Sequence, residues 1–399
     1  MKILMMLFYL ILLLADLFLW IVLIQELRGR NRLVKYTVLA VKAALSGVFI
    51  YLFVALTLRG AIPYGPADAY RQIVMGSMAL LLLVTATASL FTLLAAGMAF
   101  LIAKKKVRWR GPVLISIFLL MTIVVADAHF RQRLNIKTVR TEIPIPGLDP
   151  TLEGLKIALV SDLHVSSWHG HYRKLERAMN SVTAEEPDLL MNTGDFITYS
   201  WQEFGESDTI LRKARAVYGA FAVEGNHDDG TYYPEYDENY GAACSEMLKK
   251  KTEASGYTLL RDTAVIINHN GTSLAVAGVV THGHRLDMSY GDFDKALGPI
   301  SDSLFTILLL HDPAGWLLTS VTGRMPDLTV SGHTHGLQAG LPGGGWSPAA
   351  EFHENWKGLH RFGDSFLYVT TGLGSMGMSG RFFMPPEIVI LTLTSDRTN

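Results

Sequence analysis

The sequence predicts an α/β domain that follows an all-helical, membrane-spanning part. Residues 1 to about 130 of the 399 are nearly all apolar, whereas residues 131–399 have the composition of an ordinary soluble domain. In the soluble part, short apolar runs that end in polar residues alternate with helix-like segments, which is typical of α/β folds. The predicted organisation is a transmembrane domain at 1–130, a linker at 131–153 and the α/β domain at 154–399.

Charge and cysteine content exclude some classes of protein. The formal net charge is −1, so no basic field favours nucleic acid and no nucleic-acid partner is expected. Cys244 is the only cysteine, which rules out an internal disulfide. The soluble part is long enough to bury a core without one.

Four apolar runs have the length of membrane spans. The first covers residues 3–24; it is longer than a signal-peptide core, and no small-residue cleavage site follows it. The others cover residues 36–58, 74–103 and 113–128. The sequence therefore predicts a bundle of four transmembrane helices with the lipid bilayer as a partner.

Basic residues in the loops between the spans predict the orientation. The first and third loops carry nine lysines and arginines, and the second carries two. Short basic loops face the cytoplasm, so an even number of spans places the soluble domain outside it. Four basic residues just after the last span oppose this orientation: Arg131, Arg133, Lys137 and Arg140.

Two charged residues, Asp16 and Lys42, lie well inside the first and second spans at similar depths. Two interpretations are open. Either the two side chains form an ion pair that offsets the cost of each charge in lipid, or Lys42 reaches toward the interface while Asp16 faces a neighbouring helix.

The first half of the soluble domain contains three strand–loop–helix units in series. Strands are predicted at 155–160, 189–192 and 220–223, and helices at 171–185 and 208–218. Open α/β sheets bind ligands just beyond the carboxyl ends of their strands. The segments at those ends are Asp162-Leu163-His164, Gly194-Asp195 and Gly225-Asn226-His227-Asp228.

A helix at 238–254 separates these units from a region richer in strands. Strands are predicted there at 259–268, 273–280, 305–310, 328–330, 366–370 and 388–393. His311 and Gly332-His333-Thr334-His335 again follow strands. Two imidazoles at i and i+2 rarely serve packing, so the last segment is a more specific signal than the others.

Seven side chains from these five segments are candidate metal ligands. Carboxylate oxygen and neutral imidazole suit manganese, iron and zinc, and the set would fill two adjacent sites. Asp195 is the natural bridge, since a carboxylate offers two oxygens. Two metal ions about 3.5–4 Å apart can activate water near neutral pH and clamp a phosphoryl group. The candidates are Asp162, His164, Asp195, Asn226, His311, His333 and His335.

His227 and Asp228 are the candidate catalytic residues. His227 adjoins the ligand candidate Asn226, so its imidazole can protonate a leaving oxygen without binding metal. Asp228 is expected to orient the His227 ring. The alternative is a set of unrelated polar residues, but five such segments that all follow strands argue against coincidence.

Together the five segments resemble the motif series of the calcineurin-like metallophosphoesterase superfamily, over about residues 154–396. The resemblance implies a four-layer sandwich of two mixed β-sheets flanked by helices, and His227 as the general acid. Gly372-Leu373-Gly374 and the stretch from Arg381 to Glu387 resemble its membrane-anchored bacterial cell-envelope branch. The implied ligands are Asp162, His164, Asp195 and His335 for one metal ion, and Asp195, Asn226, His311 and His333 for a second.

Two positions depart from the pattern of that superfamily, and a third residue has an open role. Many members have an Asp where this chain has Thr198, which changes the support of the metal sites rather than the ligands. Leu337 stands where the branch often has glycine. Arg381 either contacts the phosphate of the substrate as a bidentate donor or pairs with a surface carboxylate.

The prediction is a membrane-anchored, metal-dependent hydrolase of a phosphomonoester or phosphodiester that is lipid-linked or lies in the cell envelope. Two alternatives are open: a phosphodiesterase for soluble nucleotides on a membrane tether, and a non-catalytic module that senses or transports phosphate ligands. Substrate choice is expected to lie in the loops at 232–240 and 340–346, whose aromatic residues suit a lipid surface and a stacked base equally.

Overall fold

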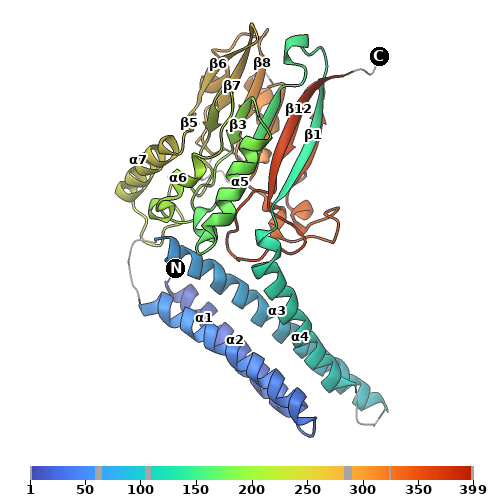
Figure 1. Cartoon of the computed structure of the whole chain (residues 1–399). Helices are drawn as coiled ribbons and strands as arrows, with labels where there is room; N and C mark the ends of the chain where they lie inside the picture. Colours follow the sequence, from blue (N-terminus) through green and yellow to red (C-terminus); the bar gives the residue numbers. More distant parts are fainter. Residues whose placement is uncertain (1, 59–64, 104–108, 283–289, 323–324, 397–399) are drawn as a thin grey trace. The chain divides into compact units, whose positions relative to one another are not determined.

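The computed structural model describes residues 2–58, 65–103, 109–282, 290–322 and 325–396 (Figure 1). The chain divides into two compact units. The helical unit consists of residues 1–60, 71–131 and 377–380. The sandwich unit consists of residues 61–70, 132–376 and 381–399.

Four long helices account for most of the helical unit: α1 (Lys2–Glu26), α2 (Arg32–Leu58), α3 (Pro66–Ala103) and α4 (Arg110–Phe130). Each is long and apolar enough to cross a membrane, which confirms the prediction of four such helices. α3 begins at Pro66 rather than at residue 74, because proline fits a first helical turn and Asp68 favours its N-terminal end. Several basic loop residues lie outside the described part of the chain, so the orientation stays a prediction: Arg59, Lys104, Lys105, Lys106 and Arg108.

Asp16 of α1 and Lys42 of α2 form an ion pair, which confirms the first of the two interpretations. Lys42 is 1% exposed, and its ammonium group also donates to Ser46 Oγ at 2.7 Å. The Ser46 hydroxyl lies 2.9 Å from Asp16 Oδ1, and Trp20 Nε1 donates to that hydroxyl at 3.0 Å. The two charges therefore compensate each other inside the helix pair, as apolar surroundings require.

Two six-stranded sheets form the core of the sandwich unit. The strand order in the first sheet is β1 (Lys137–Ile145), β12 (Glu387–Ser395), β2 (Lys156–Val160), β3 (Leu189–Asn192), β4 (Ala220–Ala222) and β5 (Thr258–Leu259). The order in the second is β10 (Gly358–Phe362), β11 (Ser365–Val369), β9 (Leu328–Ser331), β8 (Phe305–Leu309), β7 (Thr272–Gly278) and β6 (Thr263–His269). Both sheets combine parallel and antiparallel pairs, as predicted.

Alternation along each strand sorts the side chains into layers. In β2, Ile157 and Leu159 pack between the two sheets, whereas Ala158 and Val160 face the opposite side. Helices α5 (Tyr172–Ala184), α6 (Ser207–Leu211) and α7 (Glu238–Ala254) cover that side. Helix α8 (Phe293–Leu297) and the 3-10 helix η6 (Pro313–Thr322) cover the outer face of the second sheet. The expected four-layer sandwich is thus present.

The segment at 131–153 is not a linker, because it contains strand β1. β1 pairs in parallel with β12 along its whole length, from Lys137 opposite Glu387 to Ile145 opposite Ser395 (Figure 1). Pro144 lies within β1, which is possible because β1 is an edge strand and edge strands tolerate proline. The partner strand lies at the far end of the chain, so local sequence does not reveal the pairing.

The predicted strand at 259–268 is two strands that belong to different sheets. β5 is an edge strand of the first sheet, and β6 is an edge strand of the second. Between them Asp262 takes a left-handed backbone conformation with φ of 50°, which turns the chain. Arg261 and Asp262 interrupt the apolar run at this point and are the local sequence signal of the change of sheet.

Candidate metal centre

The candidate ligands lie on five loops that follow strands of both sheets. β2, β3 and β4 lead into the first three loops, and β8 and β9 lead into the last two. Five of the ligand candidates have left-handed backbone conformations, which non-glycine residues adopt only at a cost. These are Asp162 (φ 50°), His164 (36°), Asp195 (55°), His333 (69°) and His335 (50°). The backbone strain is therefore located at residues whose side chains point into the site.

Asp162, His164, Asp195 and His335 form the first group of ligands, all buried, with one ligand atom of each within 4.8 Å of the others. His335 Nε2 lies 3.1 Å from His164 Nε2 and 3.4 Å from Asp162 Oδ1. His164 Nδ1 donates to Ile197 O at 3.0 Å, which leaves its Nε2 as a lone-pair donor to a metal. The structure therefore brings together the four residues that the family resemblance assigns to one ion.

Asn226, His311 and His333 form the second group. Asn226 Oδ1 lies 2.8 Å from His333 Nδ1 and 3.1 Å from His311 Nε2, and these two ring nitrogens are 3.2 Å apart. Asp195 Oδ2 lies 3.3 Å from His311 Nε2 and 3.6 Å from His164 Nε2. One carboxylate oxygen is thus near both groups, which is where a bridging ligand has to lie.

The donor set of the second group fits a cation. His311 Nδ1 donates to Thr193 O at 2.7 Å, and His333 Nε2 lies 3.7 Å from Asp312 Oδ2. These contacts leave His311 Nε2 and His333 Nδ1 as acceptors that face the Asn226 oxygen, itself an acceptor. Buried acceptors this close repel one another unless a cation or a proton lies among them.

Without a metal ion, a proton on His311 compensates the buried charge of Asp195. Burial lowers the pKa of His311, but the Asp195 carboxylate outweighs burial and raises that pKa to about 10. Burial dominates at His164 and lowers its pKa to about 3, so this ring is neutral. A divalent cation would take the place of the proton on His311, since metal ligands bind in their deprotonated form.

His227 lies beside the first group without joining it. Its ring meets the His164 ring edge-on, with 5.1 Å between centroids, and its backbone N–H donates to Asp195 Oδ1 at 2.9 Å. His227 Nδ1 donates to the Thr198 carbonyl at 2.7 Å, and the Tyr232 ring stacks on the imidazole at 4.1 Å. With Nδ1 held, Nε2 is the nitrogen that can carry a transferable proton.

The Asp228 carboxylate holds the main chain of the Asp195 loop rather than the His227 ring. It accepts hydrogen bonds from the backbone N–H groups of Asp195 at 2.8 Å and Phe196 at 2.9 Å. The expectation that Asp228 orients His227 is therefore corrected, because the Thr198 carbonyl binds the ring instead. Burial, followed by the charge of Asp195, raises the pKa of Asp228 well above its usual range.

Thr198, which the sequence analysis linked to the support of the metal sites, and Glu203, which it missed, both support the centre. Thr198 Oγ1 lies 3.1 Å from His164 Nδ1, so a hydroxyl contacts this ligand. Glu203 is fully buried and accepts from the backbone N–H groups of Thr198 at 3.0 Å and Ser200 at 2.9 Å. Ser200 and Glu203 form a capping box, and their Ser-x-x-Glu spacing is the sequence signal that could have found the pair.

Arg381 is fully buried and bonds to backbone carbonyls. Nε donates to Gly374 O and Nη1 to Thr371 O, both at 2.9 Å. Nη2 lies 3.3 Å from His335 Nδ1, the ring nitrogen opposite the one in the ligand group. Pairing with a surface carboxylate is therefore wrong, because the guanidinium is not at the surface. The contact with phosphate stays a prediction.

Leu337 adopts a backbone conformation that suits glycine. Its φ is 44° and its ψ is 24°, two residues after the ligand candidate His335. A side chain in this region costs backbone strain that glycine does not have. The departure from the branch pattern thus leaves the turn intact and places strain next to the metal centre.

Comparisons with known proteins agree with this site. The Calcineurin-like phosphoesterase family matches residues 155–337. The uncharacterized metallophosphoesterase YkuE of Bacillus subtilis is 31% identical over 273 residues, which cover 67% of this chain and 89% of YkuE. The UDP-2,3-diacylglucosamine pyrophosphatase LpxG of Chlamydia muridarum is 29% identical over 301 residues, 64% of this chain and 88% of LpxG. Phosphopantetheinyl hydrolase from Mycobacterium tuberculosis aligns over 56% of this chain and 91% of its own at 14% identity, with a TM-score of 0.33.

Two mixed sheets that carry a buried cluster of Asp and His side chains define a metal-dependent hydrolase of phosphoesters. The chain belongs to the calcineurin-like phosphoesterase family. Its ligand candidates lie together and His227 lies beside them, so the alternative of a non-catalytic module is not retained.

Proposed function

We propose that this protein hydrolyses a lipid-linked phosphomonoester or phosphodiester of the cell envelope, with its metal centre outside the cytoplasm and its helices in the bilayer. The supporting observation is the presence, in one chain, of a buried Asp/His cluster and four helices long and apolar enough to span a membrane. The relative LpxG is a pyrophosphatase of UDP-2,3-diacylglucosamine, a compound with two acyl groups, and this supports a lipid-linked substrate.

The proposed cofactors are two divalent ions of manganese, iron or zinc. Bound there, they would supply activated water and neutralise charge on the phosphoryl oxygens. Asp195 would be shared by both ions, because one of its oxygens lies near both ligand groups. The remaining ligands would be Asp162, His164 and His335 for one ion, and Asn226, His311 and His333 for the other.

The residues around the ions have separate roles in this proposal. His227 would donate a proton from Nε2 to the leaving oxygen, since the Thr198 carbonyl holds Nδ1. Asp228 would keep the Asp195 loop in place through its backbone hydrogen bonds. Arg381 would hold the loop at Thr371 and Gly374 behind His335, and we prefer this role to a contact with substrate because its Nε and Nη1 already donate to the carbonyls of that loop.

The test compares two substrates with the same leaving group. The full chain is reconstituted in lipid vesicles and given either the 4-nitrophenyl ester of a phosphatidic acid in the same bilayer or the 4-nitrophenyl ester of thymidine 5′-phosphate in solution. The lipid ester should react faster by about tenfold or more, because anchoring raises its effective concentration. Vesicles with Asp195→Asn give the background rate. Faster hydrolysis of the nucleotide would favour the alternative, a phosphodiesterase for soluble nucleotides.

A further inference from the structure

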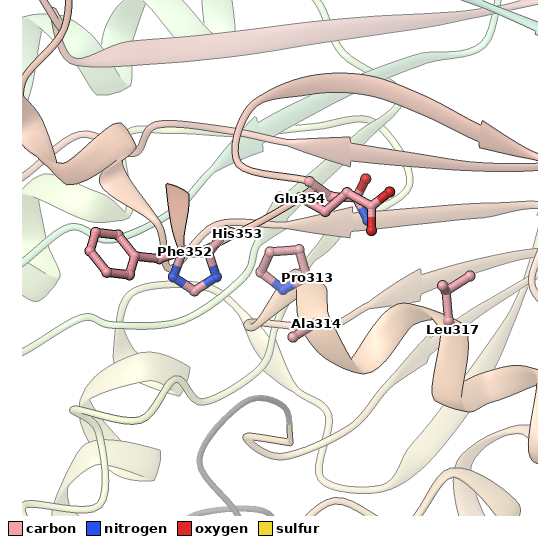
Figure 2. A pocket seen from close by; sticks show the side chains of 7 residues that line it. Pro313, Ala314, Leu317, Phe352, His353 and Glu354 are labelled. Atoms are coloured by element: carbon pink, nitrogen blue, oxygen red, sulfur yellow. The ribbon is translucent and has the colours of Figure 1, made fainter. Parts of the chain in front are cut away.

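A pocket of about 250 Å³ lies at the start of η6 in the sandwich unit (Figure 2). One wall comes from the first residues of η6 and the other from the loop after the 3-10 helix η8 (Pro348–Glu351). The lining residues are Pro313, Ala314 and Leu317 on the first wall, and Phe352, His353, Glu354 and Asn355 on the second.

The pocket adjoins the second ligand group. Its wall begins at Pro313, directly after His311 and Asp312, and Asp312 Oδ2 lies 3.7 Å from Nε2 of the ligand candidate His333. On the other wall, the His353 ring stands edge-on to the His333 ring, with 5.8 Å between centroids. A substrate whose phosphorus lies at the ligand groups would therefore have one ester substituent within reach of this pocket.

The charge of the lining selects against anions. Glu354 is exposed and is the one carboxylate among the lining residues, which include no lysine or arginine. A second phosphate or another carboxylate placed there would meet a like charge without a compensating cation. The pocket is thus unsuited to the outer phosphate of a diphosphate.

The remaining chemistry suits hydroxyl groups on a small carbon skeleton. The Glu354 carboxylate accepts hydrogen bonds from hydroxyls, and the Asn355 amide can both donate and accept. Leu317 and Phe352 are 44% and 69% exposed, so they offer apolar surface that a C–H face would cover. The volume holds a single ring or short polyol, because whole drug-sized ligands usually need about 300–1,000 Å³.

We propose that this pocket binds the uncharged, hydroxyl-bearing group esterified to the phosphate, a sugar ring or a glycerol-like polyol. The inference rests on the proposed hydrolysis of phosphoesters and names the part of the substrate that the pocket recognises. Glu354 is the specificity-determining residue, since it accepts from the hydroxyls and repels anions.

The experiment uses three 4-nitrophenyl phosphodiesters that differ in the second substituent: glycerol, propyl and 2-carboxyethyl. The full chain should prefer glycerol to propyl by about tenfold in kcat/KM, the effect of a hydrogen bond to a charged group. The 2-carboxyethyl ester should be the poorest substrate. Glu354→Gln should lower the preference for glycerol through KM with little change in kcat, and Glu354→Lys should favour the 2-carboxyethyl ester.

Glu351→Gln is the matched control, because Glu351 is exposed, lies three positions earlier and does not line the pocket. It should leave all three rates unchanged. Chelator-sensitive hydrolysis that shows no preference among the three esters, or a preference that survives Glu354→Lys, overturns the pocket assignment and leaves the proposed hydrolysis standing. If none of the three esters is hydrolysed in a chelator-sensitive reaction, both the pocket assignment and the proposed hydrolysis are overturned.

Discussion

Three histidines of the metal centre use the same ring nitrogen to bind the main chain. Nδ1 of His164, His311 and His227 lies 2.7–3.0 Å from a backbone carbonyl. This contact places a proton on Nδ1 and turns Nε2 toward the site, as a metal ligand or a proton donor. His333 is reversed, because its Nδ1 faces the ligand group while Asp312 lies near its Nε2. The role of each imidazole therefore follows from which nitrogen the neighbouring loop occupies.

Replacement of His227 should affect chemistry more than metal binding. His227→Ala should retain the metal content of the wild type and lower kcat by about 10²–10⁴-fold, the usual effect of a lost general acid. The loss should be smaller for 4-nitrophenyl esters, whose leaving group needs little protonation, than for alkyl esters. Metal analysis and rates across a series of leaving groups provide the measurement. His360→Ala is the control, since His360 Nε2 contacts the Lys357 carbonyl outside the centre. Equal losses for all leaving groups would instead indicate that His227 positions the substrate.

Replacement of Asp195 should remove metal and activity together. Its carboxylate lies between the two ligand groups, so Asp195→Asn removes charge from both. We expect the metal content and the hydrolysis of bis(4-nitrophenyl) phosphate to fall in parallel. Asp294→Asn, a change in an exposed first turn of α8, should alter neither. Wild-type turnover in chelated Asp195→Asn protein would contradict the metal assignment.

At the scale of elements, one short loop supports both a ligand and the proposed acid. Residues 197–200 provide the Thr198 carbonyl to His227 and the Ile197 carbonyl to His164. The buried Glu203 carboxylate holds this loop through the backbone N–H of Thr198. Burial raises the pKa of Glu203 from 4.5 to about 7, against the opposite effect of its hydrogen bonds.

This shift predicts a pH dependence of stability. The folded state binds the Glu203 proton more tightly than the unfolded state does. Protonated Glu203 therefore contributes fully to the free energy of unfolding below about pH 4.5, and this contribution is lost as the pH rises through 7. Glu203→Gln has no such proton, so its urea midpoint should fall less than that of the wild type between pH 5 and pH 8. Tryptophan fluorescence of the full chain in detergent and excess chelator measures both midpoints. The quantity to compare is the change of the urea midpoint with pH, because the amide of Glu203→Gln also disturbs the loop and shifts the midpoint at every pH. The same change with pH in both proteins would refute the role of Glu203.

Local sequence signals predicted the strands and loops that carry the site. They did not reveal strands whose pairing partner lies far away in the sequence. Polar residues that directly follow short apolar strands, such as Asp162 and Asn226, could be recognised because strand and loop are adjacent in sequence. Strand β1 could not be recognised in this way, because its partner β12 lies about 250 residues further along the sequence and because Pro144 resembles a turn signal. The contact of the Thr198 carbonyl with His227 could not be predicted either, because a backbone carbonyl has no sequence signature. The burial of Arg381 could not be predicted either, because burial of an arginine depends on the carbonyls around it, which only the fold reveals.

At the scale of the whole chain, the sandwich unit begins before the first metal loop. β1 follows soon after α4, and its nine pairs with β12 join the start of the soluble part to its end. A soluble fragment that begins at residue 141 would lack four of the nine residues of β1, an edge strand. Experiments on substrate preference are therefore better performed on the full chain in vesicles.

The orientation of the chain is the remaining prediction at this scale. Nine basic residues in the first and third loops against two in the second favour loops one and three in the cytoplasm. Within the helical unit, Arg110 at the start of α4 pairs with Glu26 at the end of α1 at 2.6 Å, so these two helix ends lie side by side. Alkaline phosphatase, active only outside the cytoplasm, should therefore be active when fused after Asn399 and inactive when fused after Arg108. Activity in the reverse order would place the metal centre in the cytoplasm and exclude an extracytoplasmic substrate, because a site on one side of the bilayer acts only on phosphoesters exposed on that side.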